Sequence, residues 1–438
     1  MSRTIQERSF HFLYDLAWTS LLPILIPVFP FLHHHRLIRR LVPERPVVGP
    51  CGGFVWIHAL SVGEVFSALP LIRAFRSRYP KKKVLFSATT KEGVRIAKQE
   101  LGGAGILFTT MPLDCWWSLH RITKSVQPEL FILVETDLWP GLLFHLRQKR
   151  IPAVLVNGRI SPATFRRYRR FSSAVRIIWK QFSLCLLQSE LDKRRLLHIG
   201  VRPEAVKVVG NIKYDQDWIP LGSEEEKRWR KLLNLQAGVL TLVAGSTHEG
   251  EEKILFDVFR RLRSLSADLR LIIAPRRIER SKAVQELSES RGLRTVLRSR
   301  FVNQKDPYDV IVLDTIGELG RLYGLGSFCF VGGSLVPEGG HNLLEPARFG
   351  CPVLFGTHIE DFQTMAELLI EEGGGRYIRD AEDLYQAGRE LLMDGQKRYR
   401  MGTAARGFVE RNQGAVERVM EAIASFIKEN HAKHEHTS

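Results

Sequence analysis

The sequence contains little cysteine and no recognisable metal-ligand spacing. Only 5 of the 438 residues are cysteine, the number is odd, and no pair stands at CxxC spacing. The 14 histidines form no HExxH pattern, and their only cluster, residues 33–35, follows an apolar segment. Together these absences disfavour a disulfide framework and a structural zinc site, and they fit a reducing compartment. We therefore expect buried free thiols, no metal and no cofactor.

The sequence also lacks the signatures of two common classes of nucleotide- and RNA-binding proteins. No GxxxxGK[ST] segment occurs, so the chain is not a P-loop protein, and no RRM or KH signature occurs. A hydrophobic fraction of 44% and a charged fraction of 25% exclude a disordered or low-complexity chain. At about 100–200 residues per domain, the length predicts two or three domains.

The charge balance is strongly basic. The chain has 64 Lys and Arg against 47 Asp and Glu, a formal net charge of +17. Such an excess favours an anionic partner, and nucleic acid, an acidic lipid surface and a phosphorylated substrate all satisfy that description. Composition alone does not choose among the three.

One long hydrophobic run is present, near the start of the chain. Residues 16–32 carry no charge, and a cationic stretch that includes Arg36, Arg39 and Arg40 follows them. Spanning a bilayer takes about 17–25 apolar residues, so the run is at the lower limit, and its three prolines would kink or break a helix. We expect residues 1–45 to form a membrane anchor with a basic flank on the cytoplasmic side. A single span and a segment that enters one leaflet both stay open, with a buried core helix as the other alternative; no signal-peptide cleavage site follows the run.

Short apolar runs alternate with helical patterns through the rest of the chain. Runs that are apolar throughout predict parallel strands covered on both faces, which is doubly wound α/β architecture. The predicted strands are 54–59, 84–88, 130–134, 153–157, 184–188, 206–209, 239–244, 269–274, 310–313, 328–331 and 352–355.

A polar stretch divides these strands into two similar halves. We predict a first Rossmann-like domain over residues 46–215, a linker over 216–228, a second Rossmann-like domain over 229–420 and a polar tail over 421–438. Two such halves predict a cleft between them, and ligands of open α/β sheets bind beyond the carboxyl ends of the strands. Polar residues that directly follow the strands are therefore the candidates for function.

Three such positions stand out in the first half. Glu64 lies in the turn after the first strand, where it could act as a general base or simply cap the next helix. Glu135 and Asp137 follow a very apolar strand, and burying charge there is costly unless it is paired or functional; a helix cap with Trp139 as a plug is the alternative. Lys213 could neutralise anionic charge in the cleft or be a surface lysine.

In the second half, glycine-rich loops follow the strands. Residues 245–252 open a helix with small residues and suit an oxyanion or phosphate. Arg276 and Arg277 follow the next strand and could bind an anionic ligand or lie on the surface. The densest pattern combines the glycine pair at 332–333 with the segment 338–347, where backbone amides could hold a phosphate and Glu345 could accept bonds from ribose hydroxyls.

These segments together resemble one family, the 3-deoxy-D-manno-octulosonic acid (Kdo) transferases of lipopolysaccharide synthesis. The matching pieces stand in family order from about residue 10 to 420. They are WIHALSVGEV, ETDLWP, NGRIS, QSELDKRR, VVGNIKYD, AGSTHEGEE, PRR, DTIGELGRLYG, FVGGS and GGHNLLEPA. Gly158 in NGRIS is most similar to chlamydial members, some of which add more than one Kdo, so the number transferred stays open.

The resemblance implies a GT-B fold and an inverting glycosyltransferase that needs no metal. The implied reaction moves Kdo from CMP-Kdo to a lipid A precursor, lipid IVA, and releases CMP at the cytoplasmic face of the cell inner membrane. Glu64 matches the general base, and Glu135 and Lys213 match positions that stabilise the transition state. Asp137 stands where many relatives carry Glu. The CMP-binding positions would be Pro275, Arg276, Ile316, Gly317, Glu318, Asn342, Leu343, Leu344 and Glu345.

Three basic segments of the first half give the charge excess a use: residues 81–83, 147–150 and 166–170. A polybasic surface gains about 1 kcal/mol per cation near anionic lipid. Phe165, Tyr168 and Phe171 interleave with the arginines of the third segment, as aromatic residues do at membrane interfaces. We expect this face to meet the inner-membrane surface and the acceptor phosphates, with a solvated charged face as the alternative, and we expect no nucleic-acid partner.

Two other functions stay open at this point. One is a GT-B transferase that takes a UDP-sugar donor and a lipid acceptor. The other is a basic membrane- or nucleic-acid-binding protein that has kept the fold without catalysis; the combination of Glu64, Arg276 and residues 342–345 disfavours it.

Overall fold

The computed structural model describes residues 10, 12–20, 40, 53–103, 105–215, 221–236, 238–301 and 307–435. The chain divides into two compact units. The first unit comprises residues 1–217 and 413–438, and the second comprises residues 218–412.

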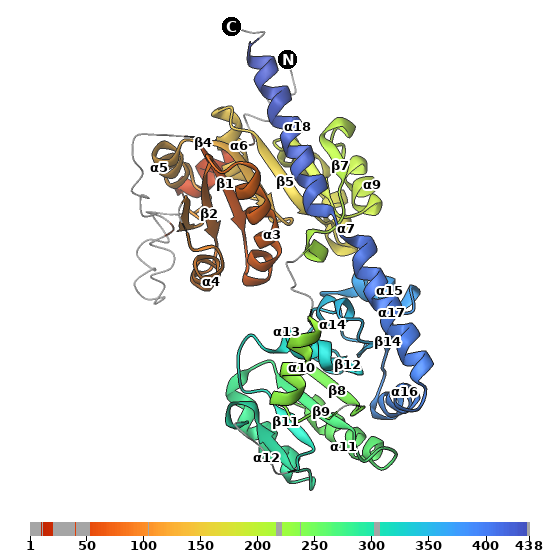
Figure 1. Cartoon of the computed structure of the whole chain (residues 1–438). Helices are drawn as coiled ribbons and strands as arrows, with labels where there is room; N and C mark the ends of the chain where they lie inside the picture. Colours follow the sequence, from red (N-terminus) through yellow and green to blue (C-terminus); the bar gives the residue numbers. More distant parts are fainter. Residues whose placement is uncertain are drawn as a thin grey trace. The chain divides into compact units, whose positions relative to one another are not determined.

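The first unit is built on a parallel sheet of seven strands in the order β3-β2-β1-β4-β5-β6-β7 (Figure 1). The strands are β1 (Phe54–Ala59), β2 (Lys83–Ala88), β3 (Ile106–Thr110), β4 (Pro128–Val134), β5 (Ala153–Gly158), β6 (Leu184–Leu187) and β7 (Val206–Val208). All residues of β1, β5 and β6 are buried, as expected for strands covered on both faces. The edge strand β3 was not predicted.

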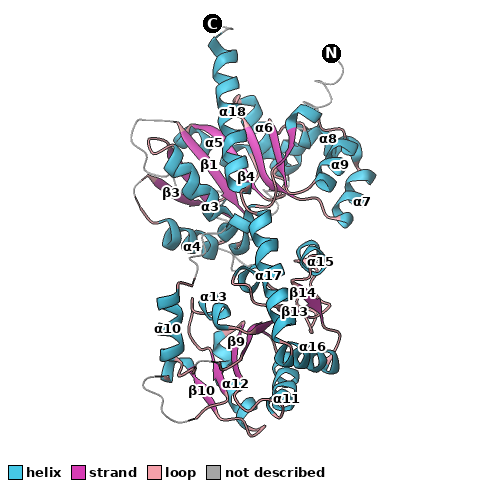
Figure 2. Ribbon diagram, turned by 45° about the vertical axis from the view of Figure 1, so that its right-hand side comes forward, coloured by secondary structure: helices cyan, strands magenta, loops and turns pink. Residues whose placement is uncertain are grey.

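Helices cover both faces of this sheet (Figure 2). They are α3 (Val62–Arg78), α4 (Lys91–Leu101), α5 (Trp116–Val126), α6 (Pro140–Gln148), α7 (Pro162–Arg170), α8 (Ser172–Trp179) and α9 (Glu190–Ile199). Alternate residues of β1 separate the two cores: Val55 and Ile57 pack with α3 and α4, whereas Phe54 and Trp56 pack with α5, α6, α8 and α9. This alternation is the period-two geometry of a strand between two helical layers.

A helix from the other end of the chain completes the first core. Helix α18 (Ala415–Glu435) contributes Val419, Met420 and Ile423 to the cluster that contains Val55 and Ile57, and it lies beside α3 (Figure 2). The predicted boundary at residue 420 and the predicted polar tail over 421–438 are therefore wrong. Apolar residues at helical spacing in this segment bury against the first sheet, and only the chain fold brings them there.

The second unit repeats the architecture with a parallel sheet in the order β10-β11-β9-β8-β12-β13-β14. Its strands are β8 (Thr241–Thr247), β9 (Arg270–Pro275), β10 (Thr295–Leu297), β11 (Val310–Val312), β12 (Phe328–Val331), β13 (Val353–Phe355) and β14 (Gly375–Tyr377). The edge strands β10 and β14 were not predicted.

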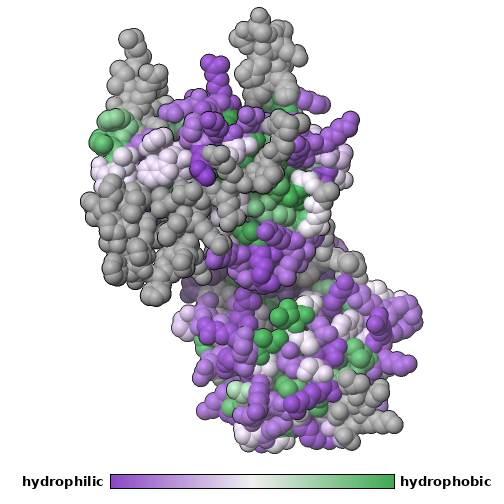
Figure 3. Space-filling model, turned by 90° about the vertical axis from the view of Figure 1, so that its left-hand side faces the viewer, coloured by the Kyte–Doolittle hydropathy of each residue, from purple (hydrophilic) through white to green (hydrophobic). Residues whose placement is uncertain are grey.

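The helices of the second unit begin inside the predicted linker. Residues 223–228, predicted as linker, belong to α10, so the linker prediction is wrong there; residues 216–220 lie outside the described part of the chain. The helices are α10 (Ser223–Leu232), α11 (Glu251–Arg263), α12 (Ser281–Glu289), α13 (Leu319–Leu322), α14 (Leu344–Arg348), α15 (Gln363–Glu371), α16 (Ala381–Met393) and α17 (Gly395–Asn412). Its surface mixes hydrophilic residues with small, separate hydrophobic patches (Figure 3).

The predicted anchor falls mostly outside the described residues. Residues 12–20 are helical, and Tyr14 donates a hydrogen bond to Asp114 Oδ2 at 2.6 Å, which fixes this helix to the first unit. Phe12, Leu13 and Leu16 expose most or about half of their surface. Among the described residues, no helix has the length and apolarity needed to cross a membrane.

We predict that Ile423→Ala destabilises the first unit, because the residue is fully buried against its sheet. A large-to-small change in a core costs about 2–5 kcal/mol. Tryptophan fluorescence during urea unfolding measures the loss, since Trp56 and Trp179 are buried in this unit. Glu421→Ala, on the exposed side of the same helix, is the control. Equal stability of the two variants would contradict the assignment of α18 to this core.

Candidate functional site

The order of the first sheet reverses between β1 and β4. This is the switch point, where chains leave neighbouring parallel strands in opposite directions and open α/β sheets bind their ligands. Ala59 and Val134 are register partners at the carboxyl ends of the two strands. Glu64 lies one turn past β1 and Glu135 directly follows β4, so these two predicted carboxylates belong to the switch point.

Glu64 is held by the start of α3. Ser61 caps the helix, and Glu64 Oε2 accepts hydrogen bonds from the backbone N–H of Leu60 at 2.5 Å and of Ser61 at 3.2 Å. Burial, followed by the negative charge of Glu135, raises the pKa of Glu64 to about 7. The two sequence interpretations are therefore compatible: one oxygen caps the helix, and Oε1 accepts no hydrogen bond from the described residues.

Glu135 and Lys213 form a half-buried ion pair. Lys213 Nζ lies 2.8 Å from Glu135 Oε1, and the two side chains expose 31% and 21% of their surface. Glu135 adopts a φ of 64°, a left-handed conformation that costs about 1–3 kcal/mol for a non-glycine residue and that collects at functional sites. Lys213, which sequence alone could not separate from a surface lysine, thus pairs with Glu135 at the switch point.

Three further residues hold the chain around Lys213 in place. The sequence analysis did not identify them as functional. Asn157 Oδ1 accepts a hydrogen bond from the N–H of Ile212 at 3.1 Å, and Asn157 also has a left-handed φ of 59°. Gln188 binds both Asn157 and Asn211. Asp215 accepts hydrogen bonds from the N–H groups of Gly414 and Val416, which ties the Lys213 turn to the start of α18. The available signal was their position near strand ends: Asn157 lies near the end of β5, Gln188 directly follows β6, and Asp215 ends the turn after β7.

Asp137 does not cap the following helix. Asp114 accepts the N–H bonds of Gly141 and Leu142 at 2.9 and 2.6 Å and so caps α6 instead. Burial raises the pKa of Asp137, although Trp139 and Arg40 favour its charged form, and its Oδ2 is buried without a hydrogen-bond partner among the described residues. The alternative of a carboxylate cap is therefore wrong, and Trp139, contacted by the Arg40 guanidinium 5.4 Å from its ring centroid, begins the helix beside it.

Helix α7 presents the predicted arginine cluster. Arg166, Arg167, Arg169 and Arg170 are exposed, and none has an ion-pair partner in the described part of the chain. Phe165 and Tyr168 pack against the first unit's core, so the predicted interfacial aromatic pattern is wrong for these two. Phe171 alone of the three is largely exposed.

In the second unit, backbone N–H groups of the glycine loop after β12 already donate hydrogen bonds to a carboxylate of the chain. Glu251 on α11 accepts hydrogen bonds from the backbone N–H groups of Gly333, Ser334 and Leu335 at 2.8–3.0 Å, and from that of His248 at 2.9 Å. A buried carboxylate therefore occupies these four amides, and for them the predicted phosphate contact is wrong. The rest of that prediction, the segment 338–347 and the start of α11, stays a prediction.

The other predicted nucleotide-binding residues follow β9 and precede or open α14. Pro275 is buried at the end of β9, and Arg276 exposes its guanidinium without a partner among the described residues. Asn342 accepts a hydrogen bond from the N–H of Leu344 at 3.1 Å. Burial raises the pKa of Glu345 to about 7, although Asn342 and Arg276 favour its charged form.

The remaining predicted residues divide into exposed and buried positions. Leu343 and Leu344 are buried, so only their backbone can reach a ligand. Ile316 is 87% exposed, and Gly317 takes a φ of 86° that favours glycine. Glu318 lies 2.9 Å from Arg298 Nη2, so its carboxylate is paired.

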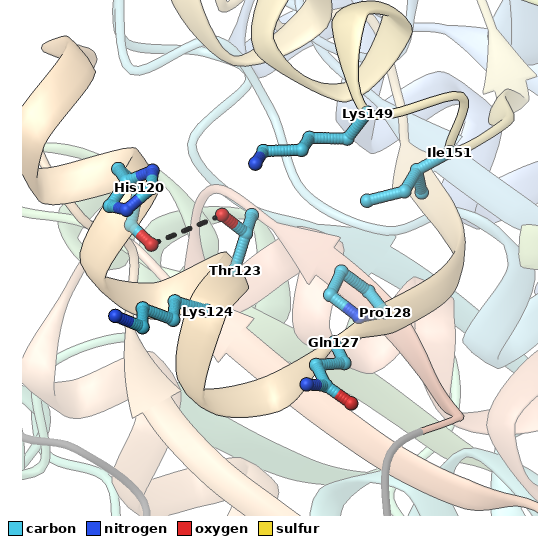
Figure 4. Close-up of a pocket in the computed structure, with 7 residues that line it drawn as sticks. All are labelled: His120, Thr123, Lys124, Gln127, Pro128, Lys149 and Ile151. Atoms are coloured by element: carbon cyan, nitrogen blue, oxygen red, sulfur yellow. Dashed lines mark hydrogen bonds between the residues drawn. The ribbon is translucent and has the colours of Figure 1, made fainter.

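A cavity of about 460 Å³ lies elsewhere, between α5 and α6 (Figure 4). Pro128 and Ile151 line it, at the amino ends of β4 and β5, and Lys149 points across it toward His120 and Thr123. None of the predicted site residues lines this cavity. The switch point at the carboxyl ends is therefore the candidate site of the first unit.

Comparison with known proteins gives one consistent family. Residues 34–216 match the family described as 3-deoxy-D-manno-octulosonic-acid transferase (kdotransferase). The chain is 33% identical over 385 residues to the 3-deoxy-D-manno-octulosonic acid transferase of Haemophilus influenzae, covering 86% of this chain and 88% of that protein. It is 31% identical to the enzyme of the same description from Chlamydophila psittaci, covering 88% and 87%. The predicted similarity to chlamydial members is present, with the Haemophilus protein slightly more similar.

Solved structures show the fold. A UDP-GlcNAc 2-epimerase from Neisseria meningitidis superposes with a TM-score of 0.60 at 14% identity, covering 85% of this chain and all of that one. A glycosyltransferase from Rickettsia africae gives 0.57 at 13% identity, covering 86% and 99%. The predicted two-domain α/β fold of the GT-B type is confirmed, whereas the N-terminal anchor stays a prediction.

We predict that Glu64→Gln stabilises the protein at high pH relative to low pH. The amide mimics the protonated acid, whereas wild-type Glu64 must ionise in a partly buried place beside Glu135 as the pH rises from about 4.5 to about 7. After allowance for solvent screening, the difference in unfolding free energy between variant and wild type should grow by about 1–2 kcal/mol.

Urea unfolding at both ends of this pH range measures the change. Glu421→Gln, an exposed carboxylate of the same unit, is the control and should show no such growth. A difference that is independent of pH would show that the Glu64 pKa is not raised.

Proposed function

Because the chain belongs to the family of Kdo transferases, we propose that it transfers Kdo from CMP-Kdo to a lipid A precursor, lipid IVA, in lipopolysaccharide synthesis. The chain is a glycosyltransferase. The observation that supports the proposal most is the Glu64–Glu135–Lys213 group at the switch point of the first sheet.

Glu64 has the properties of a general base for this reaction. Its pKa near 7 matches the operating pH at which proton transfer from a hydroxyl is most effective, and Oε1 is unoccupied by the described residues. In the proposed step the acceptor hydroxyl oxygen forms a bond to the anomeric carbon of Kdo. The bond from that carbon to the CMP oxygen breaks, CMP leaves with the electron pair, and Glu64 takes the hydroxyl proton. Attack opposite the leaving group inverts the anomeric centre.

Glu135 and Lys213 act through their own charges on the charged groups of the reaction. Glu135 raises the basicity of Glu64 through its own negative charge. Lys213 pairs with Glu135 at 2.8 Å and is only partly exposed, so its cation would favour the negative charge that develops as CMP departs. We assign both to transition-state stabilisation.

The second unit supplies the proposed donor site. The unpartnered guanidinium of Arg276 suits the CMP phosphate. Pro275, Leu343 and Leu344 would contribute backbone contacts because their side chains are buried. Glu345 and Asn342 would meet the ribose hydroxyls, and Ile316, Gly317 and Glu318 would border the nucleotide. The cleft that brings donor and acceptor together stays a prediction.

The acceptor explains the arginines of α7. Lipid A precursors carry phosphates, and four exposed arginines, which have no ion-pair partner in the part of the chain that the structure describes, provide charge-assisted donors for them and for anionic headgroups. We propose that this helix meets the cytoplasmic face of the inner membrane and that residues 1–45 anchor the chain there. Whether the anchor spans the bilayer or enters one leaflet stays open.

We predict that Glu64→Gln lowers kcat by about a hundredfold to ten-thousandfold and leaves the KM for CMP-Kdo nearly unchanged, since the amide cannot accept the proton. Mass spectrometry of lipid IVA incubated with CMP-Kdo measures the product. In the wild type, kcat should rise with pH until Glu64 is ionised above about 7.

Glu421→Gln is the control for this assay. Full activity of Glu64→Gln would remove Glu64 from the mechanism. Inhibition by UDP and not by CMP would favour a UDP-sugar donor over the proposed one.

We predict that replacing Arg166, Arg167, Arg169 and Arg170 with Ser weakens binding to anionic vesicles by at least about tenfold, because each cation near the surface contributes about 1 kcal/mol. Vesicle co-sedimentation and the KM for lipid IVA measure the effect. The control removes four exposed cations of the second unit: Lys253, Arg260, Arg389 and Arg400. An equal loss of vesicle binding in both variants would show that the effect depends only on net charge. No loss of binding in either variant would refute the α7 interface.

A further inference from the structure

Two histidines meet at the switch point of the second sheet. The strand order of this sheet reverses between β8 and β12, the position at which α/β sheets bind ligands. His248 directly follows β8, and His341 lies in the loop between β12 and α14. Arg276 follows the neighbouring strand β9. None of the roles proposed above uses either histidine.

The two rings are in direct contact. The Nε2 atoms lie 2.8 Å apart, and the rings are stacked with centroids 5.1 Å apart and planes at 17°. His248 Nδ1 lies 3.9 Å from Glu338 Oε1. A Cβ at Gly333 would approach the His341 ring to 3.1 Å, so the glycine makes room for the ring, and its φ of 67° also favours glycine. The backbone of the loop is therefore shaped to allow the contact between the two histidine rings.

The short contact permits only one proton between the two Nε2 atoms, because one ring must donate and the other must accept. If His248 keeps its Nδ1 proton toward Glu338, then its Nε2 is the acceptor and His341 Nε2 is the donor. A neutral His341 then presents an unprotonated Nδ1, which cannot donate to an anion. Protonating His341 turns Nδ1 into a donor while the contact with His248 is kept.

The surrounding charges decide when that protonation occurs. Burial, then Arg276 and then His248 lower the pKa of His341 to about 4, so the ring is neutral near pH 7 without a ligand. Glu338 faces His248 from the same loop, and Glu345 lies within the field of Arg276. Glu251 is already engaged by four backbone N–H groups. An anion beside Arg276 would offset the guanidinium charge and favour the imidazolium.

We propose that the His248–His341 pair, backed by Glu338, is a phosphate-binding subsite that takes up a proton when the nucleotide of the donor binds. The subsite rests on the proposed function, because it needs CMP beside Arg276. It gives the donor phosphate two cationic partners, of which one is permanent and one is created by binding.

Calorimetric titration with CMP in buffers of different ionisation enthalpy counts the protons. The wild type should take up a fraction of a proton per CMP near neutral pH, and His341→Gln should lose this uptake. CMP contributes its own phosphate protons equally in both proteins, so the difference belongs to the pair. Cytidine, which lacks the phosphate, should bind without proton uptake.

The affinity for CMP should also depend on protonation of His341. His341→Gln should weaken CMP binding by about tenfold near pH 6 and by less near pH 8, because a charge-assisted bond is lost only where the ring can be protonated. His248→Gln and Glu338→Gln should reduce the uptake in the same direction. The thermal unfolding midpoint shows whether His341→Gln folds. If it does not fold, the variants His248→Gln and Glu338→Gln test the proposal instead. His358→Gln, at a half-exposed histidine of the same unit, is the matched control.

Two failures are distinguishable. Absence of CMP binding in every buffer would overturn the proposed donor and this subsite with it. CMP binding with the same proton count in the wild type, His341→Gln and His248→Gln would overturn the subsite alone and leave the proposed donor in place.

Discussion

The closeness of two carboxylates at the carboxyl ends of β1 and β4 is the constraint on which the proposed chemistry depends. Glu64 is partly satisfied by two backbone N–H groups, yet burial and Glu135 still raise its pKa to about 7. A carboxylate with more donors would be a weak base, and one without donors would not be held in place. Lys213 pairs with the second carboxylate, Glu135, at 2.8 Å and so holds it in place.

The second unit uses a carboxylate at the equivalent place for the opposite purpose. Glu251 accepts four backbone N–H bonds and is fully buried, so it fixes the glycine loop after β12 and engages the amides of residues 333–335. In the proposed function, the side chains of Arg276 and His341 recognise the anion in this unit. In the proposed function, the two units thus divide proton transfer and anion binding between them.

Much of the framework follows from local patterns. Central strands such as β4 and β8 contain continuous apolar runs, 130–134 and 242–244, since helices cover both faces, and those runs are visible in the sequence. The unpredicted strands β3, β10 and β14 are all at sheet edges and are only partly buried, so they lack the continuous run. The helix α18 was assigned to the wrong unit. Its apolar face indicates that the helix packs against a core, but the sequence does not indicate which of the two cores it joins.

The sequence by itself determined the family, the two α/β units and the candidate residues Glu64, Glu135 and Arg276, because a strand end followed by a polar side chain is a local feature. Tertiary structure decided which of those residues act together. The Glu135–Lys213 pair joins residues 78 positions apart, the Glu251 carboxylate reaches a loop 82 positions away, and the His248–His341 contact spans 93. Such contacts depend on strand order and register, which no single stretch of sequence encodes.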